Sequence, residues 1–565
     1  MEQHTHPIAI EIDAGRETGL LARNWRYIGY DENNYTHTPE GEALLADFGA
    51  MEAAPCFVRT HHMLCTGNLH GVYKWGSTNA YSEDDAGNPV YTWDTVDRVL
   101  DTLLRSNCKP FFELGFLPFH LVDPKHFDGM SDFQQYDAYK HQFWAYPPKD
   151  YGKWQDLIAA LVSHCVDRYG RDEVLTWYWE LWNEPDIFYW QGTPEEFFRL
   201  FDHTEHALHQ VLPDARLGGP GTTDPNPGSN SLAFLEAFLT HCRQGRHAVT
   251  GAAGTRLDFI TFHTKGGGFP FKLNASKETP TIGKQVSQVR TGLDAMRRHG
   301  FGGLEVVLSE ADPDGWAAGG VCDNANMKFR NTEYYASYVA CGYHHIEALA
   351  REWGSPVRPL AWAFLFRGER CFEGTRTFST QGIDKPVMNA FRLFSRLGEK
   401  TLSLCSSGER FMAAPAHQEA PADTGCRGTG TTPPDISGTA TLTKDGTLAV
   451  LIYSHHDDWD VRETQQLTLS VRALSQIPGL QGGLEGREVQ VTHLRIDATH
   501  SNAHTHWQAM GCPEYPKPAQ MDALKRGARL EPLAAPQTVP VVQDQVRLTF
   551  PMPAHAVSLI DLRLV

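Results

Sequence analysis

Between about residues 20 and 400, short apolar runs alternate eight times with amphipathic helical segments. Each run ends in polar residues, and a loop leads from it to the next helical segment. Strands that alternate with helices pair in parallel through right-handed crossovers. Eight such units predict an α/β fold, a (β/α)8 TIM barrel, enlarged beyond the typical ~250 residues by long loops. The candidate strands are Asn24–Gly29, Cys56–Arg59, Pro110–Phe116, Thr176–Leu181, Arg216–Gly219, Leu257–Phe262, Leu304–Leu308 and Leu360–Phe366.

A doubly wound open sheet is the main alternative to the barrel. No GxGxxG follows the first run, and no Walker sequence is present in the chain. The usual nucleotide-binding reasons for an open sheet are therefore missing.

Apolar spacing and end signals mark the helices between the runs. One helix is expected over residues 96–104, where apolar residues recur at i, i+3, i+4, i+7 and i+8. A second is expected over 154–169 by the same spacing. A third begins at Thr193-Pro194-Glu195-Glu196, a capping box with proline at the first helical position. A fourth covers 286–296 and ends at Gly300.

After Lys400 the pattern changes to alternating runs and turns. Residues 414–438 are rich in Pro, Gly, Thr and Ala, which predicts a loop. The runs contain no long helical segment, so we expect an accessory C-terminal β-sandwich. The strand-like stretch His6–Glu11 is expected to pair with it. The runs are Thr439–Thr443, Leu448–Ser454, Gln466–Arg472, Glu488–Leu494, Val546–Phe550 and Ala556–Leu564. The expected domains are an N-terminal strand over 1–17, the barrel over 18–400 and the β-sandwich over 401–565.

The charge of the chain excludes some partners. The 565 residues include 50 basic and 68 acidic side chains, a formal net charge of −18. No run of Lys or Arg forms a basic groove, so we expect no nucleic acid as a partner. A neutral substrate is favoured over an acidic one for the same reason.

The cysteines and the N-terminus bear on the compartment. No apolar run reaches the roughly 18 residues that cross a bilayer, so no membrane partner is expected. The start MEQHTHPIAIEIDAG is acidic and polar, unlike a secretory signal. Eleven cysteines without a CxxC motif are typical of reduced thiols. We expect a cytoplasmic protein, or a periplasmic one if a signal was removed. The oligomeric state stays open.

Two glutamates follow the fourth and seventh candidate strands. Glu184 lies in the motif Trp179-Glu180-Leu181-Trp182-Asn183-Glu184-Pro185-Asp186, and Glu310 follows Leu308-Ser309. Catalytic groups of barrels come from the carboxyl ends of the strands. Asn-Glu-Pro alone is a weak signal, and strand-end acids are also common helix caps. In a barrel, however, two opposed glutamates indicate a glycosidase. Asn183 and Glu184 cannot both face inward on a regular strand, so the chain must turn there.

At these positions the sequence resembles glycoside hydrolase family 39. The resemblance covers nearly the whole chain, and the family contains two retaining activities, β-xylosidase and α-L-iduronidase. The matching segments are Phe57-Val58-Arg59-Thr60-His61, Trp182–Asp186, Leu217–Gly221, Phe262–Gly266, Glu310–Pro313, Gly382–Val387 and Arg495–Ala503.

The resemblance implies roles for individual residues. Glu184 corresponds to the acid/base and Glu310 to the nucleophile, and Asn183 is expected to bind the sugar 2-hydroxyl and the nucleophile. The other expected substrate-binding residues are His61, His263, Lys265, Asp312, Trp316 and Phe116. His61 has an alternative reading as a core histidine, Lys265 as a solvated loop charge, and Glu180 is expected to fill a polar layer inside the barrel.

Metals and cofactors are not expected. The chain has 27 His, but it has no HExxH and no His-x-His at the end of the first barrel strand. The expected site therefore contains no metal ligand, and no cofactor is assigned.

The resulting hypothesis is an exo-acting retaining β-xylosidase that releases terminal xylose from β-xylosides and xylo-oligosaccharides. Long aromatic-rich loops favour a closed pocket for one terminal sugar of a small oligosaccharide or glycoside. The alternatives are an α-L-iduronidase, another exo-β-glycosidase and a non-catalytic glycan-binding barrel. Lys265 and Trp316 resemble iduronidase residues, whereas the stretch around Asn331 resembles bacterial xylosidases. A retaining mechanism predicts carboxyl groups about 5–5.5 Å apart.

Overall fold

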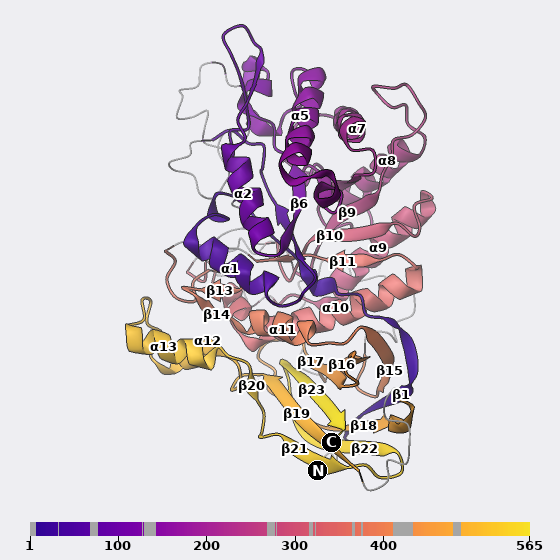
Figure 1. The fold of residues 1–565 in the computed structure, drawn as a ribbon, viewed down its shortest axis with the longest axis vertical. Coiled ribbons are helices and arrows are strands. Elements are labelled where there is room, and N and C mark those ends of the chain that lie inside the picture. The colour runs from indigo at the N-terminus through magenta and orange to yellow at the C-terminus, as the bar shows by residue number, and fades with distance from the viewer. Residues whose placement is uncertain are drawn as a thin grey trace.

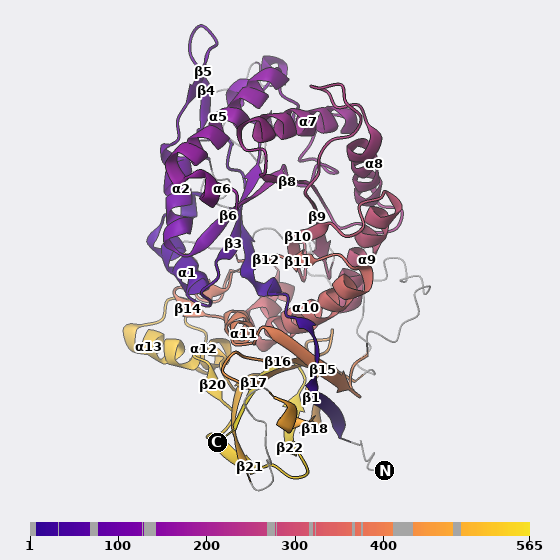
Figure 2. The ribbon, with the colours of Figure 1, turned by 45° about the vertical axis from the view of Figure 1, so that its right-hand side comes forward.

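The protein consists of a barrel and a curled β-sheet, with helices α10 and α11 between them (Figure 1). The computed structural model describes residues 7–31, 33–67, 77–126, 128, 143–267, 277, 279–315, 320–322, 324–363, 368–374, 377–410, 433–477 and 487–564. Both described ends of the chain lie on the side of the curled sheet that faces away from the barrel (Figures 1 and 2).

The barrel is a parallel sheet in the order β11-β10-β9-β8-β7-β6-β3-β2-β12. β11 pairs with β10, and β12, two residues further along the chain, pairs with β2, so the segment from Val357 to Trp362 brings the two ends of the sheet together. The expected TIM-barrel fold is therefore confirmed. The strands are β2 (Tyr27–Tyr30), β3 (Cys56–Thr60), β6 (Cys108–Leu114), β7 (Tyr178–Leu181), β8 (Arg216–Thr222), β9 (Phe259–Lys265), β10 (Glu305–Asp312), β11 (Val357–Pro359) and β12 (Ala361–Trp362).

The helices surround the strands as an outer ring (Figure 2). The expected capping box is present: the backbone N of Glu196 donates to Oγ1 of Thr193 at 3.2 Å, and the backbone N of Thr193 donates to the Glu196 carboxylate at 2.8 Å. Among the described helices, none has the length and apolar character that a bilayer crossing requires. The barrel helices are α1 (Pro39–Gly49), α2 (Asp94–Arg105), α5 (Tyr151–Tyr169), α6 (Arg171–Val174), α7 (Pro194–Val211), α8 (Asn230–Gln244), α9 (Ile282–Arg298), α10 (Glu333–Trp353) and α11 (Pro386–Ser395).

The accessory domain is one mixed sheet that curls around its own apolar core. β1 lies in this sheet, antiparallel to β15 and parallel to β18. Apolar residues from strands across the whole sheet, such as Ile10, Ile452, Leu469 and Ile560, share one buried cluster. The strands are β1 (Ile8–Leu20), β15 (Lys400–Ser406), β16 (Asp435–Leu442), β17 (Leu448–His455), β18 (Thr464–Arg472), β19 (Glu488–Ile496), β20 (Glu531–Pro532), β21 (Gln537–Pro540), β22 (Gln545–Pro553) and β23 (Ala556–Leu564).

Sequence patterns did not predict every local element. Residues 24–26, expected to open the first strand, form a short 3₁₀ turn before β2. Two short helices, α12 (Ala503–Ala509) and α13 (Pro518–Gly527), interrupt the C-terminal region where we expected strands and turns alone. The hairpins β4 (Tyr81–Glu83) with β5 (Pro89–Tyr91) and β13 (Ser379–Thr380) with β14 (Ile383–Asp384) lie outside both large sheets.

The curled sheet is joined to the barrel through an apolar interface on α10. Every residue of β17 is buried, because Val450 and Ile452 face the core of the curled sheet while Leu451 and Tyr453 join the core of the barrel. A strand that is covered on both faces has an almost continuous apolar sequence, and β17 has such a sequence.

Candidate active site

Arg59 lies at the centre of a charged layer inside the barrel. Successive residues of a strand point to opposite sides, so Phe57, Arg59 and His61 share the inner side of β3 and its continuation. The side chain of Arg59 is fully buried. Its Nε donates to Oε2 of Glu180 at 2.6 Å, and its Nη2 lies 3.0 Å from Oε2 of Glu113. These ion pairs replace the hydration that burial removes.

The same guanidinium reaches two of the expected site residues. Nη2 of Arg59 donates to Oδ1 of Asn183 at 3.0 Å, and Nη1 lies 3.7 Å from Oε1 of Glu310. Burial opposes the charged form, but the charges of Glu180, Glu113 and Glu310 raise the pKa of Arg59 above its ordinary value. Arg59 therefore stays charged and holds Asn183 and Glu310 in position.

Glu184 follows β7 through a turn with left-handed backbone. β7 ends at Leu181, and Trp182 and Glu184 have φ angles of 68° and 48°. The backbone N of Glu184 donates at 2.7 Å to the carbonyl of Gly221, which itself has a φ of 63°. This is the turn expected from the adjacency of Asn183 and Glu184.

A β-bulge directs Glu310 into the barrel. Leu308 of β10 pairs with Phe262 of β9, and Glu310 pairs with the next residue, His263. Ser309 is therefore an additional residue, and it shifts the alternation of β10 by one position. The bulge places Glu310 on the same side of the sheet as His263.

His263 lies between the two glutamates. Its Nδ1 is 2.9 Å from Oε1 of Glu184 and 3.8 Å from Oε2 of Glu310. The three side chains form one cluster, in which a carboxylate oxygen of Glu184, a ring nitrogen of His263 and a carboxylate oxygen of Glu310 all lie within 4.8 Å of one another. Nε2 of His263 is buried and has no hydrogen-bond partner in the part of the chain that the structure describes. It is therefore available to a hydroxyl of a bound ligand.

Lys265 is held by two carboxylates. Its Nζ lies 2.7 Å from Oε2 of Glu310 and 3.0 Å from Oδ2 of Asp312. Asp312 is fully buried, and Nη1 of Arg330, in the 3₁₀ segment Ala325–Asn331, lies 3.7 Å from its Oδ1. Lys265 is thus an ion-paired residue of the site and not a solvated loop charge.

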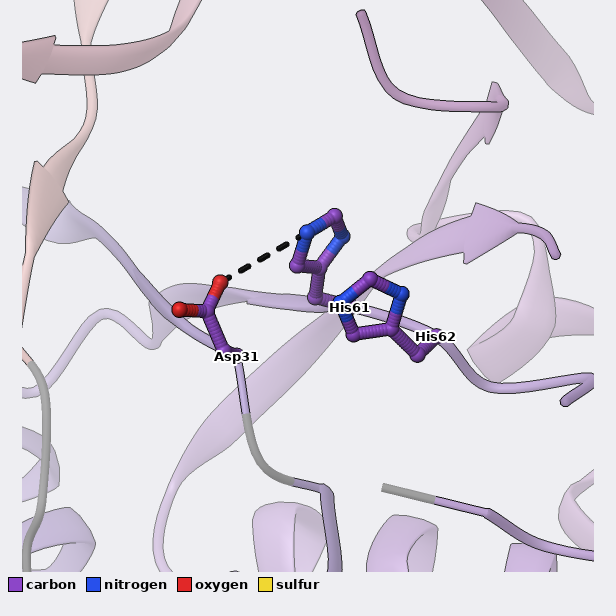
Figure 3. Close-up of side chains that lie close together, drawn as sticks. All are labelled: Asp31, His61 and His62. Carbon is purple, nitrogen blue, oxygen red and sulfur yellow. Dashed lines mark ion pairs between the residues drawn. The ribbon is translucent and has the colours of Figure 1, made fainter. Parts of the chain in front are cut away.

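His61 faces a second carboxylate at the end of β3. Its Nε2 lies 3.5 Å from Oδ1 of Asp31, as Figure 3 shows, and its Nδ1 is hydrogen-bonded to Oε2 of Glu113. Burial, together with the positive charges of His61 and Arg59, holds the pKa of the adjacent His62 well below its usual range. His62 is therefore neutral, and His61 belongs to the charged layer, not to an apolar core.

Phe116 belongs to an aromatic group beside these histidines. Its buried ring stacks on Trp144 with centroids 4.4 Å apart and lies 4.9 Å from Trp182 and 4.8 Å from His62. Trp316 lies outside the described residues, so its expected role stays a prediction.

Several groups of side chains have the composition of metal ligands. Two lie in the barrel, Glu184 with His263 and Glu310, and Asp31 with His61 and His62; the others, Cys341 with His345 and Asp435, and His344 with His345 and Glu409, lie where α10 meets the curled sheet. Carboxylates, imidazoles, an amide and an ammonium group together suit hydrogen bonds to a polyhydroxylated ligand.

Residues 8–534 match the family model of glycosyl hydrolases family 39. The chain belongs to this family. It is 26% identical to a β-xylosidase of Geobacillus stearothermophilus, over 78% of this chain and 75% of that protein. It is 25% identical to human α-L-iduronidase, over 94% of this chain and 75% of that protein.

A solved structure has the same fold. A monomeric β-xylosidase from Caulobacter crescentus CB15 superposes with a TM-score of 0.72 at 21% identity, covering 98% of this chain and 99% of the other. Membership of family 39 makes the protein a glycoside hydrolase with a carbohydrate substrate, and it confirms the family expected from the sequence. Both known activities appear among the relatives at nearly equal identity, so the comparisons leave the substrate open.

Proposed function

We propose that this glycoside hydrolase is an exo-acting retaining β-xylosidase that releases terminal xylose from β-xylosides and xylo-oligosaccharides. In the proposed reaction Glu310 attacks the anomeric carbon while Glu184 protonates the departing oxygen. Water then hydrolyses the glycosyl-enzyme, with Glu184 acting as the base.

The observation that carries the retaining mechanism is the short separation of the two carboxylates. One carboxylate oxygen of Glu184 lies within 4.8 Å of one carboxylate oxygen of Glu310. Direct attack requires carboxyl groups about 5–5.5 Å apart, whereas an inverting enzyme leaves about 6.5–9.5 Å for a water molecule. The spacing favours direct attack.

The charges around the two glutamates support the division of roles. Glu310 contacts the cations Lys265 at 2.7 Å and Arg59 at 3.7 Å, which favour its ionised, nucleophilic form. Among the described residues, the ionic partner recorded for Glu184 is His263. The side chain of Glu184 is 17% exposed and that of Glu310 is 7% exposed. The greater exposure suits an acid/base, because this group exchanges protons with the leaving group and with water.

The surrounding residues are proposed to bind the hydroxyls of the terminal sugar. Asn183, positioned by Arg59, contacts the 2-hydroxyl and the nucleophile, and His263 offers its unpaired Nε2. His61 contributes from the opposite wall together with Asp31. Hydrogen bonds of this kind stabilise the transition state when they strengthen as charge develops on the ring.

Lys265 supports a xyloside as the substrate. A uronic acid carries a carboxylate at C5, and a buried carboxylate needs cationic partners. The ammonium of Lys265 is already shared between Glu310 and Asp312, so it has little charge to offer a third carboxylate. A xylosyl ring carries only hydrogens at C5 and makes no such demand.

α-L-iduronidase is the second candidate. An α-L-iduronide without its C5 carboxylate has the ring arrangement of a β-D-xyloside, so the same pair of glutamates serves either substrate. This candidate rests on the location of Lys265 and not on its free charge: the ammonium lies 2.7 Å from the proposed nucleophile and therefore close to the bound ring, although Glu310 and Asp312 already share it.

Kinetics with three aryl glycosides test the choice. The aryl β-D-xyloside should exceed the β-D-glucoside and the α-L-iduronide in kcat/KM by about tenfold, or roughly 1.4 kcal/mol. The variant Lys265→Met should lower the rates on xyloside and iduronide alike, because Lys265 serves Glu310. A faster iduronide, or a loss in Lys265→Met confined to the iduronide, would show that the site binds a uronate.

The proposal includes a reducing, cytoplasmic compartment. All ten cysteines that the structure describes are free thiols, and seven of them are buried. Such thiols persist where glutathione keeps them reduced.

A further inference from the structure

Two exposed hydrophobic side chains lie next to each other directly after the proposed acid/base. Ile187 is 36% exposed and Phe188 is 52% exposed, three and four residues beyond Glu184. In the described part of the chain few other large hydrophobic side chains are this exposed, and no two of those are neighbours in sequence; they are Leu20, Val90, Tyr515 and Val542. Isolated exposed apolar residues are ordinary, but an adjacent pair at the edge of a site indicates binding.

The backbone around Phe188 is fixed. The amide of Ile187 donates to the carbonyl of Glu184 at 3.3 Å, and the amide of Trp190 donates to the carbonyl of Ile187 at 3.2 Å. The indole Nε1 of Trp182 donates to the carbonyl of Tyr189 at 2.9 Å. The turn that carries Phe188 is therefore tied both to the acid/base and to the end of β7.

A series of stacked rings connects Phe188 to the buried aromatic group of the site. The ring of Phe188 stacks on Tyr189 with centroids 4.4 Å apart and planes 29° apart. Tyr189 stacks on Phe116 at 5.6 Å and 18°, and Phe116 stacks on Trp144 at 4.4 Å and 19°. A continuous series of rings thus leads from the buried aromatic group of the site to the surface. A ring held in this way loses little conformational freedom when a ligand covers it.

The chemistry of the site indicates what Phe188 faces. A general acid must lie within hydrogen-bond reach of the oxygen that departs, so the leaving group lies on the side of Glu184. We propose that Phe188, flanked by Ile187, is the binding platform for the leaving group, and that it packs against the apolar face of a second xylopyranose ring. This inference rests on the proposed function and adds to it the subsite beyond the bond that is cleaved.

A pair of substrates with and without a ring in the leaving group tests the platform. On xylobiose, kcat/KM of Phe188→Ala should fall roughly threefold to tenfold, the range expected for the loss of one ring contact. On β-D-xylosyl fluoride, whose leaving group has no ring, the variant should stay within about 1.5-fold of wild type. When benzyl alcohol is added as an acceptor, Phe188→Ala should form less benzyl xyloside and more free xylose than the wild type does, because water then reacts with the xylosyl-enzyme instead.

Matched variants separate the contribution of a flat aromatic ring from that of apolar surface in general. Phe188→Trp should keep wild-type rates, because it keeps a flat face, and Phe188→Leu should lose most of the xylobiose activity. Val542 is an exposed apolar residue in the connection between β21 and β22, and Val542→Ala should change the rate on neither substrate.

The outcomes distinguish this inference from the function on which it rests. Wild-type rates of Phe188→Ala on xylobiose, or equal losses on xylobiose and the fluoride, would overturn the platform and leave the xylosidase proposal intact. A wild-type enzyme that hydrolyses neither xylosyl donor would overturn the proposed function and the subsite with it.

Discussion

The inner positions of β18 and of β3 illustrate two different interiors in one chain. In the curled sheet, Leu467 and Leu469 both point into an apolar core. In the barrel, the inner side of the sheet changes from the aromatic Phe57 to the fully buried cation Arg59 within two residues. Burying charge gives less stability than burying apolar groups of the same size. The contrast indicates that the core of the curled sheet contributes stability, whereas the charged layer around Arg59 serves the chemistry of the site.

The largest expected effect is on turnover, from the charged layer. Glu310→Ala removes the proposed nucleophile, and kcat/KM on every xyloside should fall by at least about 10⁴-fold, or roughly 5.4 kcal/mol. Its unfolding free energy should change little, because Lys265 keeps Asp312 as a partner at 3.0 Å. Steady-state rates and urea denaturation check both parts. Substantial residual turnover would contradict the role of Glu310.

The second effect is on stability and compares the same substitution in the interior of the barrel and on the surface of the curled sheet. Arg59→Met leaves Glu113 and Glu180 buried without their cation, and it should lower the free energy of unfolding by about 3–5 kcal/mol. Arg472→Met on β18 removes an exposed ion pair with Asp13 and should cost about 0–1 kcal/mol. Urea denaturation of both variants measures the difference. Equal losses would mean that the buried ion pairs of Arg59 contribute no more to stability than an exposed pair does.

The third effect depends on the leaving group. Glu184→Ala removes the proton donor, so hydrolysis of xylobiose should fall about 10²-fold or more, while an activated aryl xyloside should suffer less in the first step. Azide should then restore turnover of the aryl xyloside by attacking the glycosyl-enzyme in place of activated water. Burst kinetics with and without azide check this. Equal losses on both substrates, without rescue, would argue against Glu184 as the acid/base.

The sequence predicted the barrel and the positions of its strands because buried strands and amphipathic helices have distinct periods. It also placed Glu184, His263, Glu310 and Lys265 at the carboxyl ends of strands, where the structure brings them together.

The sequence did not reveal how the charges are paired. Arg59 was visible as a charge two residues before His61 on the same side of a strand, but its partners come from three other strands. The bulge at Ser309 leaves no sequence signature either, since it depends on the register between β10 and β9. Pairings between distant segments are tertiary properties, which local periodicity does not encode.

The smallest expected effect concerns pH and the buried carboxyl of Glu113. Burial raises the pKa of Glu113 well above 4.5, and Arg59 only partly opposes this. The folded protein therefore retains the proton of Glu113 to a higher pH than the unfolded chain does. Between the unfolded and folded pKa values, folding takes up a proton, so stability is greatest below the unfolded pKa and falls as the pH rises towards the folded one.

The variant Glu113→Gln isolates this effect. The wild-type unfolding free energy minus that of the variant should decrease with rising pH above about 4.5, by at most roughly 1.4 kcal/mol per pH unit for one proton. In the curled sheet, Ile452→Val should cost about 0.5–1.5 kcal/mol at every pH, because no ionisable group is removed from that core. Urea denaturation from pH 5 to 8 gives both difference curves. A flat or rising curve for Glu113→Gln would mean that Arg59 fully compensates the burial of Glu113, and the barrel interior would then be as insensitive to pH as the curled sheet.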